Sequence, residues 1–247
     1  MTLRPDVTFH DGTPLTAQTI ADMFPLQQTG SASAGSVGTS KLTAVEATGD
    51  LEVTYTLSGS NSAFPAYLSR APLGMVFEPT AAAADPDGFT INPVGTGPFV
   101  MEKRDLDNET VMVRNENYWR MDAEGNALPY LDSIIFKPIP DEGTRLDAVT
   151  SGTNNAFQTL RQGTIRDARA VGEETIVMIE HQGSNTGGGM FNVAVAPFDD
   201  LRVRMGLTLM NDQSAVIEAL GGTGISLPST QWFSPDSPWW SQKAADA

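Results

Sequence analysis

Residues 92–119 read NPVGTGPFVMEKRDLDNETVMVRNENYW, and this stretch decides how the rest of the chain is interpreted. Gly95 and Gly97 stand among prolines, so the backbone is expected to turn tightly and to run extended from about Pro98. Apolar and polar residues alternate on both sides of residues 105–108, whose sequence DLDN favours a turn. The pattern predicts a β-hairpin with one buried face. That face would carry Phe99, Met101, Val111 and Val113.

On the C-terminal side of this hairpin, strand and helix patterns alternate. Strands are predicted at residues 133–140, with Ile135 inward, at 175–180 and at 190–195. Helices are predicted at residues 141–151, 160–171 and 214–220, and from Leu201 after a capping Asp199 or Asp200. Strands that alternate with helices predict an α/β lobe.

On the N-terminal side, Thr16 offers a hydroxyl cap for a helix over residues 17–28, which Pro25 is expected to kink or end. Residues 29–40 read TGSASAGSVGTS and predict a mobile loop. Residues 42–57 predict a hairpin with a two-residue turn at Gly49-Asp50. Short helices are expected within residues 61–70 and 78–84.

Composition excludes several classes of function. The 247 residues include 30 acidic and 15 basic side chains, a net charge of −15 that repels phosphate backbones and anionic membranes. We therefore expect no nucleic-acid partner and no membrane-surface partner. No run of apolar residues is long enough for a spanning helix. The absence of cysteine excludes disulfides, thiolate nucleophiles and zinc–thiolate sites.

No catalytic or metal-ligating set is recognisable, so we expect no catalytic residue, no metal site and no cofactor. His10 and His181 are the only histidines, too few for a metal site or a catalytic triad. Asp199 and Asp200 suit helix capping better than acid–base work, because adjacent side chains point apart. The acidic residues 105–109 lack the spacing of a calcium loop and suit a turn.

Three stretches together carry a resemblance to a known family. They resemble, in the same order, motifs of the family 5 solute-binding proteins of ABC importers. The stretches are residues 3–21 (LRPDVTFHDGTPLTAQTIA), 95–119 (GTGPF to NENYW) and 190–220 (MFNVAVAPFDDLRVRMGLTLMNDQSAVIEAL). His10 lies in the family's FHDG turn, where its role is structural. Gly206 stands where the family usually has Ala.

The resemblance implies a periplasmic-binding-protein-like α/β fold of two lobes with an additional small domain. We expect the small α+β domain over residues 1–90, part of the first lobe over 91–190 and the start of the second lobe over 191–247. Family members begin with an export leader and continue further, so the chain is interpreted as an internal fragment that lacks both ends.

One stretch is interpreted as a ligand contact. Residues 183–192 (GSNTGGGMFN) hold three successive glycines, whose bare backbone can approach a ligand or pair with a peptide as an extra strand. A flexible loop leading into a strand is the alternative, and the resemblance favours the ligand contact. The aromatic residues near Trp232 could stack on a ligand or anchor a Pro-rich loop. The predicted ligand-binding residues are Gly187, Gly188, Gly189, Met190, Asn192 and Trp232.

The resemblance implies a monomeric, periplasmic or extracellular binding protein, lipoprotein-anchored in some full-length forms. It would close two lobes around a small solute and deliver it to the permease subunits of an ABC importer. A di- or oligopeptide is the expected solute, with oligosaccharide or nickel as alternatives within the family. A hydrolase using a carboxylate pair and an inactive truncated product are the alternatives of other classes.

Overall fold

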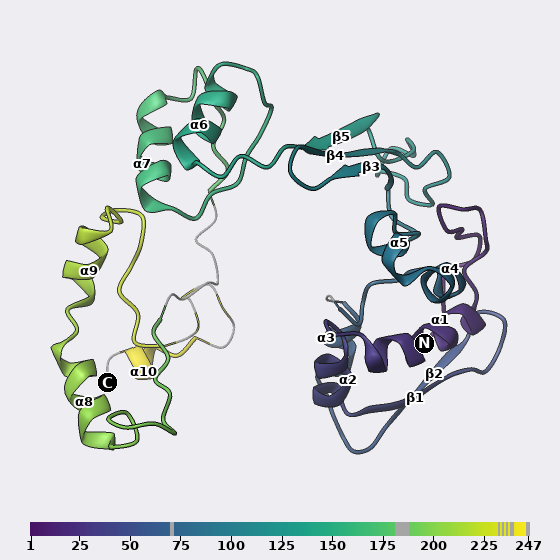
Figure 1. Ribbon diagram of the computed structural model, residues 1–247, viewed down its shortest axis with the longest axis horizontal. Coiled ribbons are helices and arrows are strands. Elements are labelled where there is room, and N and C mark those ends of the chain that lie inside the picture. Colours follow the sequence, from purple (N-terminus) through teal and green to yellow (C-terminus); the bar gives the residue numbers. More distant parts are fainter. Residues whose placement is uncertain are drawn as a thin grey trace. The chain divides into compact units, whose positions relative to one another are not determined.

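The computed structural model describes residues 1–69, 72–180, 188–231, 233, 235, 237 and 240–245. The chain divides into two compact units, Met1–Pro138 (unit 1) and Ile139–Ala247 (unit 2), whose elements are labelled in Figure 1. Within the described ranges, no helix has the length and apolar character that crossing a membrane requires. The domain boundaries expected near residues 90 and 190 stay predictions.

Helix α1 (Ala17–Thr29) begins in unit 1 where the sequence predicts it. The Thr16 hydroxyl accepts a hydrogen bond from the Thr19 backbone N–H, and the Thr19 hydroxyl accepts one from the Thr16 N–H, so the pair forms a capping box. Pro25 does not end the helix, which continues through Thr29. Burial of the neighbouring Phe24 offsets the hydrogen bond that Pro25 cannot donate.

Residues 34–40 form a helix, so the prediction of a mobile loop over residues 29–40 is wrong. Helix α2 (Ala34–Ser40) buries Val37, which is 7% exposed, and Ser40, which is 0% exposed. Val37 packs in one cluster with Phe24 and Phe64. Composition alone missed this helix because a single buried valine, supplied with partners by distant segments, stabilises it.

Strands β1 (Leu42–Ala47) and β2 (Val53–Leu57) form the predicted antiparallel hairpin. The Thr48 N–H donates to the Glu52 carbonyl at 2.8 Å, so the connection is the three residues between them rather than the predicted Gly49-Asp50 pair. The first residues of the chain pair with the residue just before β2, through an isolated bridge between Thr2 and Glu52.

Three short helices follow, and each has Pro in its first turn, as predicted for the helix at residues 78–84. They are α3 (Phe64–Leu68), α4 (Pro79–Ala84) and α5 (Pro86–Ile91). The Asp85 carboxylate caps α5 by accepting from the Gly88 N–H at 3.0 Å. The sequence predicted a helix end at Asp85, and the structure adds a second helix there.

Strands β3 (Phe99–Asp105), β4 (Glu109–Arg114) and β5 (Ser133–Phe136) form an antiparallel sheet in that order. The hairpin between β3 and β4 is confirmed, with the Asn108 N–H donating to the Asp105 carbonyl at 3.2 Å. This sheet contains the stretch with which the sequence analysis began.

The prediction of one buried apolar face on this hairpin is wrong. Met101 lies opposite Met112, and Val100 lies opposite Val113. Directly opposed residues share a face, so Met101 and Val113 lie on opposite faces. The apolar side chains are divided between both faces, and every residue of β4 is half-buried. Ile135, predicted to point inward, is 52% exposed.

The core of unit 1 surrounds α1 with two buried clusters. The first is Phe24, Val37, Leu42, Phe64 and Leu73. The second is Ala17, Ile20, Met23 and Val53. Half-buried Val45 and Tyr55 pack against both clusters and join them. Helix α1 and the hairpin β1–β2 therefore contribute to both buried clusters of unit 1.

Unit 2 begins with α6 (Glu142–Thr150) and α7 (Gln162–Val171), close to their predicted positions. The Asp141 carboxylate caps α6 by accepting from the Thr144 N–H at 2.8 Å. Leu146 and Ala168 pack with Ile176 in the buried cluster of this unit.

The strand predicted at residues 175–180 is not formed. Side-chain exposure does alternate along the segment, because Ile176 is 9% exposed whereas Val177 is 87% and Ile179 is 84% exposed. However, none of the described residues pairs with this segment, and a strand requires a neighbour to exchange backbone hydrogen bonds. Instead, the Arg169 guanidinium of α7 donates to both Glu180 carboxylate oxygens at 2.9 and 2.6 Å.

Helices α8 (Leu201–Met210) and α9 (Gln213–Ala219) follow, and α10 (Gln242–Ala245) lies near the C-terminus. Asp200 is the cap of α8 and accepts from the Arg202 N–H at 2.8 Å, as one of the two predicted capping choices. Beyond α9, the Gly224 carbonyl accepts a hydrogen bond from Arg169 at 3.2 Å, which ties this loop to α7.

Candidate functional site

The ligand contact predicted within residues 183–192 is described from Gly188 onward, and its first described residues are exposed. Gly188, Gly189 and Met190 are all exposed, and the Met190 side chain is 87% exposed. A side chain built on Gly189 would meet nothing within 4 Å. These residues are therefore open to a ligand, and their role stays a prediction. Gly187 and Trp232 lie outside the described residues.

The strand predicted at residues 190–195 is replaced by a turn. The Asn192 side-chain oxygen accepts a hydrogen bond from the Ala194 N–H at 3.1 Å, and the Asn192 carbonyl accepts one from the Val195 N–H at 3.3 Å. This turn engages the Asn192 side chain locally, as Asn commonly does in loops. The prediction failed for the same reason as at residues 175–180, since no described neighbour pairs with the segment.

Two of the stretches that carry the family resemblance meet at His10. Its ring Nδ1 accepts a hydrogen bond from the Gly95 N–H at 3.3 Å, and its Nε2 lies 3.1 Å from the Gly97 carbonyl oxygen. A neutral ring that accepts at Nδ1 must carry its proton on Nε2, which then donates to Gly97. Both nitrogens are occupied by backbone partners, which agrees with the structural role expected for His10.

Asn115 brings the end of the same hairpin to the same carbonyl. Its side-chain Nδ2 donates to the Gly97 carbonyl at 3.0 Å, and its side-chain oxygen accepts from the Asn117 N–H at 3.0 Å. Asn115 is 7% exposed. The Gly97 carbonyl therefore joins three motif segments, FHDG, GTGP and RNENYW, at one point. The sequence analysis did not predict this junction. The one signal for it was that all three segments carry motifs of the same family.

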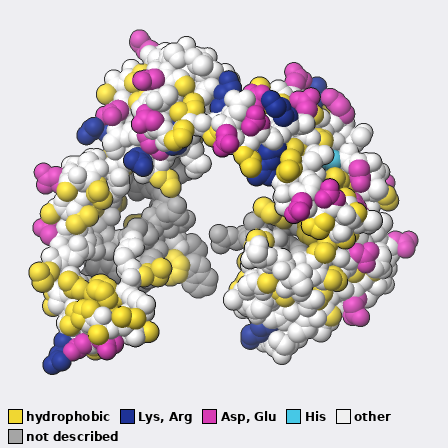
Figure 2. Space-filling view, viewed as in Figure 1, with side chains coloured by type: hydrophobic (Ala, Val, Ile, Leu, Met, Phe, Trp, Pro, Cys, Tyr) yellow, Lys and Arg dark blue, Asp and Glu magenta, His cyan; other side chains and the backbone are white. Residues whose placement is uncertain are grey.

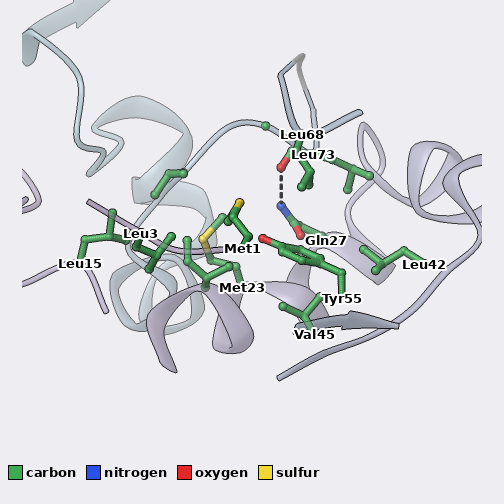
Figure 3. Close-up of a pocket in the computed structure, with 13 residues that line it drawn as sticks. Met1, Leu3, Leu15, Met23, Gln27, Leu42, Val45, Tyr55, Leu68 and Leu73 are labelled. Carbon is green, nitrogen blue, oxygen red and sulfur yellow. Dashed lines mark hydrogen bonds between the residues drawn. The ribbon is translucent and has the colours of Figure 1, made fainter. Parts of the chain in front are cut away.

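Unit 1 also contains an apolar cavity of about 100 Å³, shown in Figure 3. Its walls come from α1, from the hairpin β1–β2 and from the first residues of the chain. Leu15, Leu68, Leu73, Gly74 and Val76 complete them. Two polar groups reach it, the Gln27 amide and the Tyr55 hydroxyl. Gln27 is 8% exposed and donates a long hydrogen bond of 3.5 Å to the Leu73 carbonyl. Burial raises the pKa of Tyr55, so its hydroxyl stays protonated at neutral pH.

Charged side chains with shifted pKa values are held by local hydrogen bonds. The Tyr130 hydroxyl, with the Asn126 side chain, lowers the pKa of Asp122 to about 2. The Thr159 hydroxyl lowers the pKa of Glu142, with help from Arg145. These contacts stabilise loops and caps. Within the described ranges, no group of three acidic, histidine or cysteine side chains is placed to hold a metal ion.

Several large apolar side chains of α8 are exposed to solvent. Figure 2 shows hydrophobic side chains gathered over α8. Leu209 and Met210 of this helix are 83% and 82% exposed, and Leu201 is 58% exposed. Acidic side chains, in contrast, are scattered over the visible face and form no single patch there.

Comparison with known proteins identifies the family. A family model described as bacterial extracellular solute-binding proteins, family 5, middle, matches residues 1–247. Heme-binding protein A of Haemophilus influenzae is 31% identical over 205 residues, covering 77% of this chain and 35% of that protein. The dipeptide-binding protein of Escherichia coli is 30% identical over 156 residues, covering 61% of this chain and 28% of that protein. The matched part of this chain thus covers about a third of the length of these relatives.

A solved structure of similar fold is AgaA, a PBP from A. tumefacien R10 in complex with agropinic acid. It has a TM-score of 0.80 and 22% identity, and the match covers 100% of this chain and 48% of that chain. The predicted fold class, a periplasmic-binding-protein-like α/β fold of which this chain spans about half, is confirmed. With the fold, the three motifs and a family model matched along the whole chain in agreement, the chain belongs to the family 5 bacterial extracellular solute-binding proteins.

Proposed function

We propose that the protein to which this chain belongs is the extracytoplasmic solute-binding component of an ABC importer. It acts as a monomer, binds a di- or oligopeptide-like solute in a cleft between its lobes, and delivers that solute to the permease in the membrane. The observation that carries this proposal is the match of the family model over residues 1–247. Hinged closure around a solute requires no bond to be broken, so the proposal includes no catalytic step.

A peptide-like solute is supported by the backbone at Gly188 and Gly189. Both residues are exposed and carry no side chain that would keep a ligand's main chain at a distance. An extended peptide can exchange N–H and C=O hydrogen bonds with such a segment in the manner of an added strand. The 30% identity to a dipeptide-binding protein supports the same class of solute.

Heme is the second candidate solute, because the relative named as a heme-binding protein matches a larger part of this chain than the dipeptide-binding protein does. The two candidates make different demands on the protein. A peptide needs backbone partners and a small number of polar anchors, whereas a porphyrin needs a broad apolar surface. Nickel and oligosaccharide remain alternatives for the same family site.

The experiment is thermal unfolding of the chain, followed by circular dichroism, with separate additions of mixed short peptides, heme, nickel chelates and mixed oligosaccharides. A solute that binds only the folded state raises its stability by about 2.7 kcal/mol at 100 times Kd. We expect the peptides to raise the midpoint most. A larger shift with heme would replace the peptide proposal, and turnover of a peptide or glycoside would overturn the binding role.

Two variants locate the contact. Gly188→Pro removes a backbone N–H and fixes φ, so it is expected to abolish the peptide-induced shift. Leu160→Gln alters an exposed side chain outside the predicted ligand-binding residues and leaves the backbone unchanged, so the shift should persist. An equal shift in both variants and the unaltered chain would place the contact elsewhere.

A further inference from the structure

Two glutamine side chains hold the segment between α9 and α10, which Figure 1 places in unit 2. The Gln213 amide, at the start of α9, pairs with the backbone of Ser229. Its Nε2 donates to the Ser229 carbonyl at 2.9 Å, and its Oε1 accepts from the Ser229 N–H at 2.9 Å. A side-chain amide that uses its donor and its acceptor on one residue fixes that backbone at two points, as a neighbouring strand would.

Gln231 repeats this arrangement further along the segment. Its Nε2 donates to the Ser241 carbonyl at 2.9 Å, and its Oε1 accepts from the Ser241 N–H at 3.1 Å. The Ser229 hydroxyl joins the two pairs, because it donates to the Gln231 carbonyl at 2.7 Å and accepts from the Gln231 N–H at 3.3 Å. Side chain and backbone of Gln231 are therefore both held, and residues 231–241 form a closed loop whose ends lie together.

The closed loop is rich in aromatic side chains. It carries Trp232, Phe233, Trp239 and Trp240, of which Phe233 and Trp240 belong to the described residues. Phe233 is 46% exposed, and Trp240 is half-buried. The sequence analysis left two roles open for such residues, stacking on a ligand or anchoring the loop. Because the two glutamine amides anchor the ends of the loop, the exposed Phe233 ring is available to a ligand.

We propose that Gln213 and Gln231 are positioning residues, which hold the closed loop so that its aromatic side chains form a subsite for an apolar side chain of a peptide solute. The inference rests on the proposed binding of a peptide and deepens it. The backbone contact proposed at Gly188 and Gly189 is the same for every peptide, whereas an aromatic subsite distinguishes peptides by their side chains.

Positioning matters because a loop that its ligand must first order binds that ligand more weakly. Ordering of backbone and side chains on binding costs free energy, and a loop already fixed in its bound conformation avoids that cost. Gln213 and Gln231 are half-buried, so water competes less for their hydrogen bonds. Loss of either pairing should therefore lower the affinity for the side chain that the loop contacts and leave the backbone contacts unchanged.

The test measures the Kd of two blocked tripeptides, Ala-Phe-Ala and Ala-Ala-Ala, by titration calorimetry with the unaltered chain and with variants. The two peptides share a backbone and differ by one phenyl ring. We expect the unaltered chain to bind Ala-Phe-Ala at least about tenfold more tightly, because burial of the ring in the subsite is favourable.

Two variants break the pairings separately. Gln231→Glu keeps the shape but replaces the donor by a carboxylate oxygen that faces the Ser241 carbonyl at neutral pH. Gln213→Glu acts from outside the loop, and an acidic residue in the first turn favours a helix, so α9 should persist. Each should bind Ala-Phe-Ala about tenfold more weakly and Ala-Ala-Ala as before. Gln158→Glu makes the same change in an exposed side chain of unit 2 and should keep the preference.

Tryptophan fluorescence reports on the closed loop without any solute. After Trp119→Phe, all remaining tryptophans lie within residues 232–240. In that background, Gln231→Glu and Gln213→Glu should increase quenching of the emission by acrylamide, whereas Gln158→Glu should not. Unchanged quenching in both of the first two variants would show that the glutamine amides do not hold the loop, and would overturn the inference.

The peptide measurements can overturn it separately. Equal losses of affinity for both peptides would indicate a general disturbance of unit 2 rather than a side-chain subsite. An undiminished preference for Ala-Phe-Ala in both variants would place the subsite elsewhere. Equal binding of both peptides by the unaltered chain would overturn the subsite and leave the proposed function intact. Failure of both peptides to bind the unaltered chain would contradict the peptide proposal itself, and the subsite with it.

Discussion

Unit 1 and unit 2 use apolar residues in different ways. In unit 1, α1 and the hairpin β1–β2 bury two clusters of side chains, and all strands assigned in the described chain belong to this unit. In the described part of unit 2, one cluster of three residues is buried, and α8 leaves Leu209 and Met210 more than four fifths exposed. Apolar side chains are therefore buried against partners in unit 1, whereas those of α8 in unit 2 remain largely exposed.

The difference shows that an apolar pattern becomes structure only where a partner is present. Residues 51–57 alternate apolar and polar side chains, and residues 175–180 contain the apolar run Ile-Val-Met-Ile, so both segments have a strand-like sequence. The first segment forms β2 because β1 lies beside it, whereas the second forms no ladder with any described residue. Hydrogen bonds between strands and burial of side chains both require a second segment.

The largest expected effect is the loss of a buried side chain in unit 1. Phe24→Ala should lower the free energy of unfolding by about 3–5 kcal/mol, because Phe24 is 7% exposed and packs with Val37 and Phe64. Urea unfolding followed by circular dichroism measures this change. Leu209→Ala in α8 is the matched control and should change stability by less than about 0.5 kcal/mol. Equal losses would show that α8 is covered in solution.

An intermediate effect is expected where the motif segments meet. Asn115→Ala removes a donor to the Gly97 carbonyl and an acceptor of the Asn117 N–H, in a side chain that is 7% exposed. We expect a loss of about 1–3 kcal/mol in the free energy of unfolding. Hydrogen exchange should also become faster in residues 95–98 and 115–119. Unchanged exchange in both segments would show that the junction does not stabilise unit 1.

A smaller effect of opposite sign is expected in unit 2. Gly206 lies inside α8, and a side chain added to it would meet nothing within 4 Å. Gly206→Ala should therefore raise stability by about 0.5–1 kcal/mol, because alanine loses less backbone entropy in a helix. The change is measurable as increased helical circular dichroism and slower amide exchange over residues 201–210. A loss of helicity would mean that α8 requires a close approach at Gly206.

The smallest and most local effect concerns acid pH. The Asp122 carboxylate has a pKa of about 2, lowered from 3.8 mainly by the Tyr130 hydroxyl, which donates to it at 2.6 Å. A folded-state pKa below the unfolded value stabilises the fold above the unfolded pKa, and this contribution is lost as the pH falls through the folded pKa. Residues 121–130 should accordingly loosen between about pH 4 and pH 2.

NMR titration of the Asp122 carboxyl carbon checks this prediction. Tyr130→Phe removes the main hydrogen bond and should move the Asp122 pKa upward, toward 3.8. A titration of the unaltered protein at the ordinary value would contradict the hydrogen bond between these two side chains.

Local features were predictable from the sequence because neighbouring residues determine them. Thr16, Asp141 and Asp200 cap helices within three residues of their own positions. The turns at residues 48–52 and 105–109 likewise depend on short-range hydrogen bonds. The family was also recognisable, since motif residues such as FHDG and GTGPF are contiguous in the chain. The candidate solute, by contrast, was anticipated only as a class, and heme was not foreseen.

By itself, then, the sequence determined where most helices begin, where the two hairpins turn and to which family the chain belongs. Only the tertiary structure decided that residues 34–40 are helical and that Met101 and Val113 lie on opposite faces. The tertiary structure likewise decided that residues 175–180 and 190–195 form no ladder with any described residue. It also decided that His10 and Asn115 meet at Gly97, across 87 and 18 residues. The physical reason is that capping and turns are satisfied within a few residues, whereas burial, sheet register and strand pairing depend on segments that are distant in the chain.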